Sequence, residues 1–306
     1  MQQSSLGVVY PPKVVQLVGG LGNQLFGYSF GRYLEQVTGA KVSFDTHSVT
    51  SNGHGGLAIQ DAFQLNGAFE TEARFTKMIG FGYALPKVFS RLIGYPKRFE
   101  IFYQASETGF VGDLERLLQA NFVRGYFQSY RYLDQNIFED PNSFNLTLRE
   151  PSDWYLKKLA ELQEQSPIAL HIRRGDYSPL ASSYGLLGPE YYLRGVAALI
   201  ERIGSRPIVI FSDEPERVLD IQEILPKGLR TELVIPPLGA RASESLSLMS
   251  HVAGLVCANS SFSWWAGATG NRSKVVYAPN PWHRAIPTPR MLLPPTWIRA
   301  DPHWLN

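Results

Sequence analysis

Short apolar segments alternate with helical segments over residues 152–278, and no other feature of the sequence restricts the fold as strongly. Parallel strands that are apolar throughout are buried on both faces, and the helices that join them cover the sheet. The pattern therefore predicts an α/β fold with a parallel sheet in this half of the chain. We expect strands at 167–171, 207–211, 232–235, 254–258 and 274–278, and helices at 152–165, from Pro189, at 243–251 and near Ser261.

A second unit of the same type is expected nearer the N-terminus. A strand at 13–18 leads into the turn Gly19-Gly-Leu-Gly22-Asn23, which opens a helix, and further strands are expected at 41–44 and 121–128. Glycines at such a turn allow a ligand to approach the backbone, and the helix N-terminus that follows favours an anion. Apolar residues recur at the spacing of one buried helix face, and they are Phe26, Phe30, Tyr33, Leu34 and Val37.

A chain of 306 residues exceeds the size at which one hydrophobic core keeps growing, so we expect two domains. The stretch 139–151, rich in Pro, Asn and Ser, marks the boundary between them. We therefore predict an N-terminal domain of residues 1–145 with an irregular helical insert at 46–110, and a C-terminal domain of residues 146–306 that ends in a tail. Basic and aromatic residues mix within the insert, which is typical of a helical subdomain with a solvated basic face or of a surface facing an anionic membrane or a saccharide.

Composition excludes several classes of protein and compartment. The formal net charge is only +2, so no global positive field recruits nucleic acid and any recognition of an anion must be local. The single cysteine, Cys257, lies in an apolar run and is expected to be a buried thiol, which fits a reducing cytoplasm. We find neither a signal peptide nor an apolar run long enough to span a bilayer, and we expect a cytoplasmic protein.

Polar side chains collect directly after the strands of the C-terminal sheet. Because the carboxyl ends of parallel strands share one edge, where α/β proteins bind ligands, we expect these groups to converge there. Arginine forks and the amides of a helix N-terminus match a phosphate-bearing ligand. The competing interpretations are a solvated, salt-bridged turn and a helix N-cap followed by two core tryptophans. The residues concerned are Arg173, Arg174, Asp176, Asp213, Asn259, Ser260 and Ser261.

Taken together, these motifs resemble glycosyltransferase family 11, of the bacterial α-1,2-fucosyltransferase (galactoside 2-α-L-fucosyltransferase) type. The resemblance covers almost the whole chain, and the motifs occur in the order of the family. They are Gly19-Gly-Leu-Gly-Asn-Gln-Leu-Phe26, Gly125-Tyr-Phe-Gln-Ser129, His171-Ile-Arg-Arg-Gly-Asp-Tyr177, Phe211-Ser-Asp213, Leu248-Met-Ser250 and Asn259-Ser-Ser-Phe-Ser-Trp-Trp265.

The resemblance implies a GT-B type fold, in which two Rossmann-like domains face each other across a cleft. It also implies GDP-fucose as donor and an inverting transfer that requires neither a metal nor a prosthetic group. The N-terminal domain would then lie on the acceptor side, and the C-terminal domain would bind GDP-fucose. The acceptor would be a galactose-terminated glycan. A lipid-linked acceptor, a peripheral contact with the inner membrane and the oligomeric state are left open.

The resemblance also assigns roles to individual residues. Arg173 would neutralise the leaving diphosphate with help from His171 and Arg174, because a fixed cation stabilises the charge that develops as the bond breaks. Two sets of residues would contact the donor or lie close to it. One set, in the C-terminal domain, is Asn259, Ser260, Ser261 and Phe262. The other, near the N-terminus, is Gly22 and Asn23, and the resemblance places Asn23 and Gln24 near both the fucose and the acceptor.

Two assignments stay open at this point. The family commonly has an acidic residue at the start of the helix that carries Leu-Met-Ser, whereas this chain has Ser245 there with Glu244 beside it, so the residue that reads guanine is either Glu244 or Asp213. The general base that takes the proton of the acceptor is Asp176, with Glu190 as a second candidate, unless Asp176 serves only to orient the arginines.

Three other functions compete with fucosyl transfer. A different nucleotide sugar would use the same arginines, because the donor's sugar is not readable from the sequence. A non-catalytic nucleotide- or carbohydrate-binding protein would retain the fold without turnover. An NAD(P)-dependent oxidoreductase is the outsider, since the first glycine turn lacks the third glycine of a dinucleotide-binding fingerprint.

Overall fold

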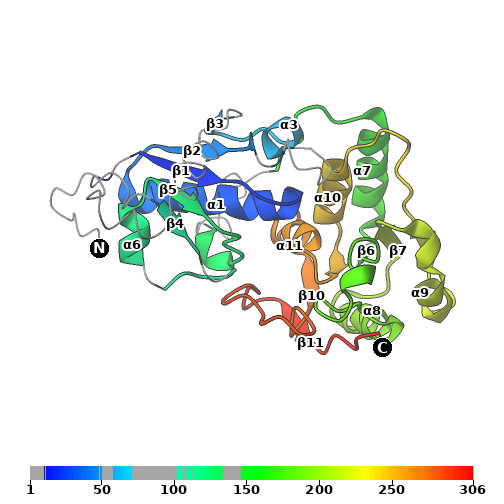
Figure 1. Ribbon diagram of the computed structural model, residues 1–306. Helices are drawn as coiled ribbons and strands as arrows, with labels where there is room; N and C mark the ends of the chain where they lie inside the picture. The colour runs from blue at the N-terminus through cyan, green and yellow to red at the C-terminus, as the bar shows by residue number, and fades with distance from the viewer. Residues whose placement is uncertain are drawn as a thin grey trace. The chain divides into compact units, whose positions relative to one another are not determined.

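The computed structural model describes residues 10, 12–47, 49, 58–70, 102–105, 108–112, 114–133 and 146–305 (Figure 1). The described residues divide into two compact units. Unit 1 lies within Met1–Gln60 and Leu65–Asp134, and unit 2 lies within Asp61–Gln64 and Gln135–Asn306. The boundary predicted at residue 145 and the basic and aromatic part of the predicted insert fall outside the described residues. No helix in the described ranges combines the length and the apolar character needed to cross a bilayer.

Unit 1 is built on a parallel sheet with the strand order β3-β2-β1-β5-β4. The first two strands along the chain pair in parallel, with Val15 opposite Phe44, and a helix joins them. The strand predicted at 121–128 already ends at Arg124, and Phe127, within the predicted range, has a positive φ of 46° that is incompatible with a strand. The elements are β1 (Lys13–Gln16), α1 (Leu21–Thr38), β2 (Val42–Asp45), β3 (Ala68–Glu70), β4 (Phe102–Gln104), α6 (Leu114–Gln119), β5 (Phe122–Arg124) and the 3-10 helix η2 (Tyr130–Tyr132). A short helix, α3 (Ile59–Ala62), spans the point where the chain passes from unit 1 to unit 2.

The helix α1 confirms most of the predicted buried face. Phe26, Phe30 and Leu34 are buried, and Tyr33 is half-buried with its ring edge-on to that of Tyr132. The prediction was wrong for Val37, which is exposed because it lies in the last turn, just before the helix ends at Gly39. Helix ends extend past the layer that covers the sheet, so apolar periodicity overstates burial there.

Unit 2 contains a parallel sheet of six strands in the order β11-β10-β9-β6-β7-β8, and all five predicted strands are present. The strand β11, at one edge, was not predicted. Figure 1 shows α8 and α9 on one face of this sheet and α7, α10 and α11 on the other. The elements are α7 (Asp153–Gln165), β6 (Ile168–Ile172), η4 (Ser178–Leu180), α8 (Pro189–Ile203), β7 (Ile208–Ser212), η5 (Pro215–Arg217), α9 (Leu219–Ile224), β8 (Thr231–Leu233), α10 (Ala242–Ser250), β9 (Gly254–Val256), α11 (Ser261–Ala268), β10 (Val275–Pro279) and β11 (Ile298–Ala300).

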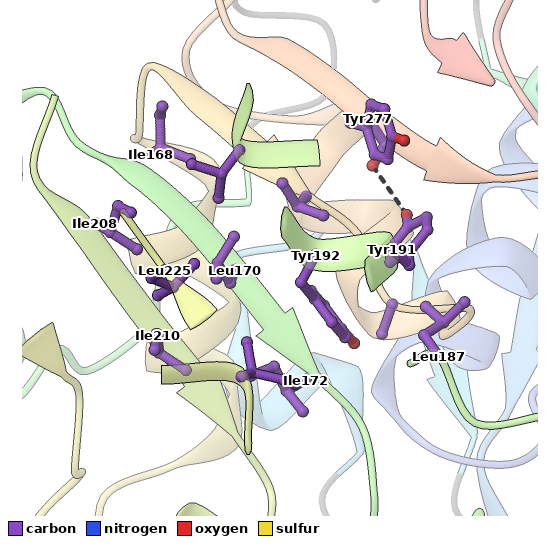
Figure 2. Close-up of a cluster of buried hydrophobic side chains, with 14 of the residues drawn as sticks. Ile168, Leu170, Ile172, Leu187, Tyr191, Tyr192, Ile208, Ile210, Leu225 and Tyr277 are labelled. Carbon is purple, nitrogen blue, oxygen red and sulfur yellow. Dashed lines mark hydrogen bonds between the residues drawn. The ribbon is translucent and has the colours of Figure 1, made fainter. Parts of the chain in front are cut away.

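The core of unit 2 lies between the sheet and α8. Figure 2 shows Ile168, Leu170 and Ile172 along β6, facing Tyr191 and Tyr192 of the helix. Each fully buried aliphatic side chain of this kind contributes about 1.5 to 3 kcal/mol to stability. The Tyr191 hydroxyl donates to the carbonyl of Cys257 at 2.7 Å, so α8 fixes the segment that follows β9. Cys257 is buried as predicted, and burial raises the pKa of its thiol to about 12.

Each sheet has one position at which the direction of strand addition reverses. In unit 2, β7 and β8 extend from one side of β6, while β9, β10 and β11 extend from the other. In unit 1 the reversal lies between β1 and β5. Helices leave opposite faces at such a point and open a crevice at the carboxyl ends of the strands, so these are the two places where ligand binding is expected.

A buried lysine ties together the two helices that follow β8 and β9. The Lys274 ammonium donates to the carbonyl of Ser250 at the end of α10, and to those of Ala266 and Thr269 at the end of α11, at 2.5 to 2.8 Å. Carbonyls at a helix C-terminus have no partner within the helix and favour a cation. Lys274 therefore caps both helices at once.

Candidate functional site

Arg173 lies at the carboxyl end of β6, at the reversal point of unit 2. Its guanidinium pairs with Asp176 at 2.8 Å and with Asp213 at 3.3 Å, and lies over the ring of Tyr177 at 5.7 Å from the centroid. Burial disfavours the charged form, but the two carboxylates outweigh this effect and raise the pKa of Arg173. The side chain is 27% exposed, so a permanent positive charge is held in place and remains within reach of a ligand.

Asp213 holds the backbone of the turn that carries Arg173. One carboxylate oxygen accepts a hydrogen bond from the amide of Arg174 at 2.9 Å, and the other accepts from the amide of Gly175 at 3.1 Å. A Cβ atom at Gly175 would lie 2.8 Å from this carboxylate, which explains the glycine. Both oxygens of Asp213 are therefore engaged by the turn, and reading of guanine by Asp213 stays a prediction.

Arg174 differs from its neighbour, because its side chain is buried, at 3% exposed. It donates to the carbonyl of Leu187 at 2.8 Å and lies 3.7 Å from the carboxylate of Asp220. These contacts anchor the turn to the segment before α8 and to α9. The predicted contact of Arg174 with the donor stays a prediction, and the structure gives the side chain a bracing position.

His171 is buried on β6, with its ring 5.6 Å from that of Phe262. Its backbone carbonyl accepts from the hydroxyl of Tyr192 at 3.1 Å. Burial, together with the charge of Arg173, lowers the pKa of His171 to about 3, so the imidazole is neutral at physiological pH. His171 therefore adds no second positive charge beside Arg173.

The N-terminus of α11 lies beside this turn. Ser260 caps the helix by accepting from the amide of Phe262 at 3.3 Å. The side-chain amide of Asn259 donates to the backbone carbonyls of Tyr184 and Gly185, at 2.9 and 3.3 Å. Ser261, in the first turn, is partly exposed. The first-turn amides and Ser261 are thus placed to meet an anion, whereas Ser260 and Asn259 mainly shape the turn.

Sequence reasoning missed three side chains that surround the two turns. Tyr177 donates from its hydroxyl to the carbonyl of Asn259 at 3.1 Å. Its ring lies 5.0 Å from that of Tyr184, which meets the ring of His283 edge-on at 5.0 Å. The only available signal was the position of Tyr177 at the end of the His-Ile-Arg-Arg-Gly-Asp-Tyr motif, since the other two belong to loops without a recognisable pattern.

The acidic candidates occupy different positions. Glu244 is buried in the first turn of α10, where one carboxylate oxygen accepts from the amide of Ser152 at 2.6 Å. Asp176 is 64% exposed and paired with Arg173. Glu190 is also exposed, and it pairs with Arg194 on the same helix and with His303. Among the described residues, no group of three His, Cys, Asp or Glu side chains is arranged to hold a metal ion.

The reversal point of unit 1 brings together two motifs that are about a hundred residues apart in the chain. Asn23, in the first turn of α1, accepts from the side-chain amide of Gln128 at 2.8 Å. Gln24 donates to the carbonyl of Gly19 at 3.0 Å and accepts from the amide of Ile59 at 3.0 Å. Gly19 has a φ of 70°, and a Cβ there would lie 2.9 Å from Asn23, so only glycine fits. Gly22 lies buried in the same turn of the helix.

Comparison with known proteins identifies relatives of the whole chain. It is 28% identical to an alpha-1,2-colitosyltransferase of Escherichia coli over 88% of this chain and 91% of the relative. It is 25% identical to the O-antigen biosynthesis glycosyltransferase WbnK of Escherichia coli, over 87% of this chain and 93% of the relative. The solved structure of the NodZ alpha-1,6-fucosyltransferase, from a crystal soaked with GDP-fucose, is similar in fold, with a TM-score of 0.50 and 15% identity. The likeness covers 85% of this chain and 92% of NodZ, an enzyme of Bradyrhizobium.

These likenesses bear on the fold and on the family. The fold shared with NodZ and the two parallel α/β sheets confirm the predicted fold class, GT-B type with Rossmann-like units. The family profile described as Glycosyl transferase family 11 matches residues 121–286, which is more than half of the chain and includes Arg173, Asp213 and the start of α11. The chain therefore belongs to glycosyl transferase family 11 and is a glycosyltransferase, as its motifs predicted.

Proposed function

We propose that the protein is an inverting α-1,2-fucosyltransferase that moves L-fucose from GDP-fucose to the 2-hydroxyl group of a terminal galactose. The observation that carries this proposal is the guanidinium of Arg173, held beside the N-terminus of α11 at the reversal point of a family 11 sheet. A fixed cation and a helix N-terminus on one edge form a site for a diphosphate. We expect the enzyme to act in the cytoplasm.

The names of the relatives support parts of this proposal. The Escherichia coli relative is named for an α-1,2 linkage, and the NodZ crystal was soaked with GDP-fucose. Because NodZ is an α-1,6-fucosyltransferase, the fold by itself does not set the linkage. The acceptor is expected to be a galactose-terminated glycan, free or lipid-linked.

In the proposed reaction the bond between the anomeric carbon of fucose and the oxygen of the β-phosphate breaks, and its electron pair leaves with GDP. The 2-hydroxyl oxygen of galactose bonds to the same carbon from the opposite face and loses its proton. Arg173 stabilises the negative charge that develops on the phosphate, and this is the kind of interaction that lowers the barrier most. We assign Asp176 to orienting Arg173, because its carboxylate contacts the guanidinium directly.

Glu244 is our choice for the residue that reads guanine. Asp213 already accepts two backbone amides, whereas the second carboxylate oxygen of Glu244 is buried with no hydrogen-bond partner among the described residues. The adjacent hydroxyl of Ser243 is likewise buried and unpartnered within the same ranges. A buried acceptor without a donor is costly, and the N1 and N2 donors of guanine would satisfy it.

Incubation of the purified chain with GDP-fucose and a panel of β-galactosides tests the proposal. We expect release of GDP and a product whose new linkage is α-1,2 by NMR spectroscopy. Absence of product across the panel would contradict fucosyl transfer. A non-catalytic binding protein would bind GDP-fucose without releasing GDP, and an oxidoreductase would bind NAD(P).

Colitosyl transfer is the second candidate, because the Escherichia coli relative is named for that sugar. Colitose is L-fucose without the 3-hydroxyl group, so the two donors differ by one hydrogen-bonding group. Competition between GDP-fucose and GDP-colitose in the same assay separates the candidates. A ratio of kcat/KM that favours GDP-colitose would overturn the choice of donor and leave the diphosphate site intact.

A further inference from the structure

Tyr177 contacts both halves of the candidate diphosphate site. Its ring lies under the guanidinium of Arg173 at 5.7 Å, and its hydroxyl donates to the carbonyl of Asn259 at 3.1 Å. Asn259 directly precedes Ser260, the N-cap of α11. One side chain therefore joins the end of β6 to the end of β9.

A ring contact of Tyr177 and two hydrogen bonds of Asn259 support this position. The ring of Tyr177 packs against Tyr184 at 5.0 Å, and the carbonyl of Tyr184 accepts from the side chain of Asn259. The segment from Tyr177 to Gly185 thus holds Asn259 by hydrogen bonds at two places, the backbone carbonyl of Asn259 and its side-chain amide. Burial raises the pKa of Tyr177, so its hydroxyl remains a hydrogen-bond donor at neutral pH.

We propose that Tyr177 is a positioning residue, which sets the spacing between the guanidinium of Arg173 and the N-terminus of α11. This inference rests on the proposed function, because the spacing matters only if both groups meet one diphosphate. A diphosphate requires two donor groups at a fixed separation. A displacement of either group loses contacts without any change in the residues that touch the ligand.

The substitution Tyr177→Phe tests the inference, because it keeps the ring under Arg173 and removes the hydroxyl that holds Asn259. We expect the Kd for GDP, measured by calorimetry on the full chain, to rise roughly three- to tenfold, the scale of one hydrogen bond. We also expect kcat with GDP-fucose to fall by a similar factor. Tyr177→Leu removes the ring contact as well, so its effect should be larger.

Tyr191→Phe is the matched control. The Tyr191 hydroxyl also donates to a carbonyl that follows β9, that of Cys257, and it lies 3.5 Å from the carbonyl of Tyr277, the bond drawn in Figure 2. Tyr191 belongs to the hydrophobic core of unit 2. This variant should lose thermal stability while its Kd for GDP stays within about twofold of the wild type. An equal rise in Kd for both tyrosine variants would reduce Tyr177 to a stabilising residue and overturn the inference.

A second substitution separates positioning from general loosening. With Arg173→Ala in place, no guanidinium remains to be positioned, so Tyr177→Phe should change the Kd for GDP by less than about twofold. An undiminished effect in that background would overturn the inference. If the wild-type chain binds GDP and the Tyr177→Phe variant has the same Kd and kcat as the wild type, this inference alone is overturned. A wild-type chain that does not bind GDP would overturn the proposed function as well.

Discussion

The two reversal points of the molecule share a topology but differ in chemistry. Beside the reversal point of unit 2, the ends of β6 and β7 carry Arg173, Asp213 and a buried histidine. Between β1 and β5 of unit 1, the strand ends carry glycines and the amides of Asn23 and Gln128. Parallel sheets offer a ligand position at the same place in both units, and the side chains decide which ligand each one suits.

The difference suggests how a glycosyltransferase divides its work. A charged edge suits a diphosphate, because charge-assisted hydrogen bonds are about twice as strong as neutral ones. An edge of side-chain amides and glycine backbone suits a sugar, because it can hydrogen-bond uncharged hydroxyl groups and carries no charge that binds an anion. We therefore propose that unit 2 stabilises the leaving group and that unit 1 contacts sugar hydroxyls. Three predictions test this division, and a fourth tests the neutral histidines of unit 2.

The largest effect is expected for Arg173→Ala. Loss of the cation should lower kcat at least about a hundredfold, the usual scale for removing a charge-stabilising donor. Steady-state kinetics of GDP release measure it. Arg230→Ala, at the amino end of β8 and mostly exposed, removes the same charge from the opposite edge of the sheet and should leave kcat unchanged. A similar loss in both variants would show that overall charge, and not the edge, matters.

The next effect concerns the stability of unit 2 toward acid. Burial lowers the pKa of His171 to about 3 and that of His283 to about 4, with Arg173 adding to the shift of His171. Unfolded histidines titrate near 6.5, so between that pH and about 4 the unfolded chain binds more protons. The free energy of unfolding should thus fall with decreasing pH, by up to about 1.4 kcal/mol per unit and per histidine.

Urea unfolding at several pH values measures this slope. His283→Phe should flatten it, because one of the histidines whose pKa is lowered by burial no longer gains a proton on unfolding. An unchanged slope in that variant would show that His283 titrates normally in the folded chain.

A smaller effect is expected for Asn23→Ala at the neutral edge of unit 1. Loss of one neutral hydrogen bond to a sugar should lower kcat/KM for the acceptor roughly three- to tenfold, with little change in the Kd for GDP. Asn121→Ala is the control. Asn121 directly precedes β5, and the substitution removes an exposed hydrogen bond from its side chain to the carbonyl of Pro12. A large loss of GDP affinity for Asn23→Ala would mean that unit 1 also holds the diphosphate.

The smallest effect is expected for Asp176→Asn. The asparagine oxygen can still accept from Arg173, and exposed ion pairs contribute little, so kcat should fall less than about fivefold. The profile of kcat against pH should keep its shape. A loss of a hundredfold or more, together with the disappearance of an acidic limb, would make Asp176 the general base. The same comparison with Glu190→Gln tests the second candidate.

The fold of unit 2 could be predicted because its central strands β6, β7 and β9 are mostly apolar and buried, and helical segments lie between the strands in the sequence. The edge strand β11 was not predicted, since its central residue, Arg299, is exposed and the two residues beside it are only half-buried. Its pairing depends on the register with β10 and not on local pattern. The end of β8 was also misplaced, because Ile235 is 64% exposed and followed by two prolines.

The site could be predicted only as a set of residue types at one edge. The sequence places Arg173 and Arg174 side by side, but adjacent residues leaving a strand point in different directions, so only one remains accessible. The roles of Tyr184 and His283 depend on two distant loops that meet at the ring of Tyr184, whose carbonyl in turn contacts Asn259. Contacts of this kind are made by tertiary packing, and they produce no regular spacing of residues in the sequence from which they could be predicted.

The capping of two helices by Lys274 has a consequence for changing donor preference. The restraint on α10 and α11 lies at their C-terminal ends, while Glu244 and Ser261 lie in their first turns. Substitutions in those first turns leave the anchor untouched, so recognition and scaffold are separable along the length of each helix. Libraries at Ser261, which is partly exposed, should therefore retain folded protein and give directed evolution toward another nucleotide sugar a starting place, whereas Glu244 is buried and accepts from the amide of Ser152.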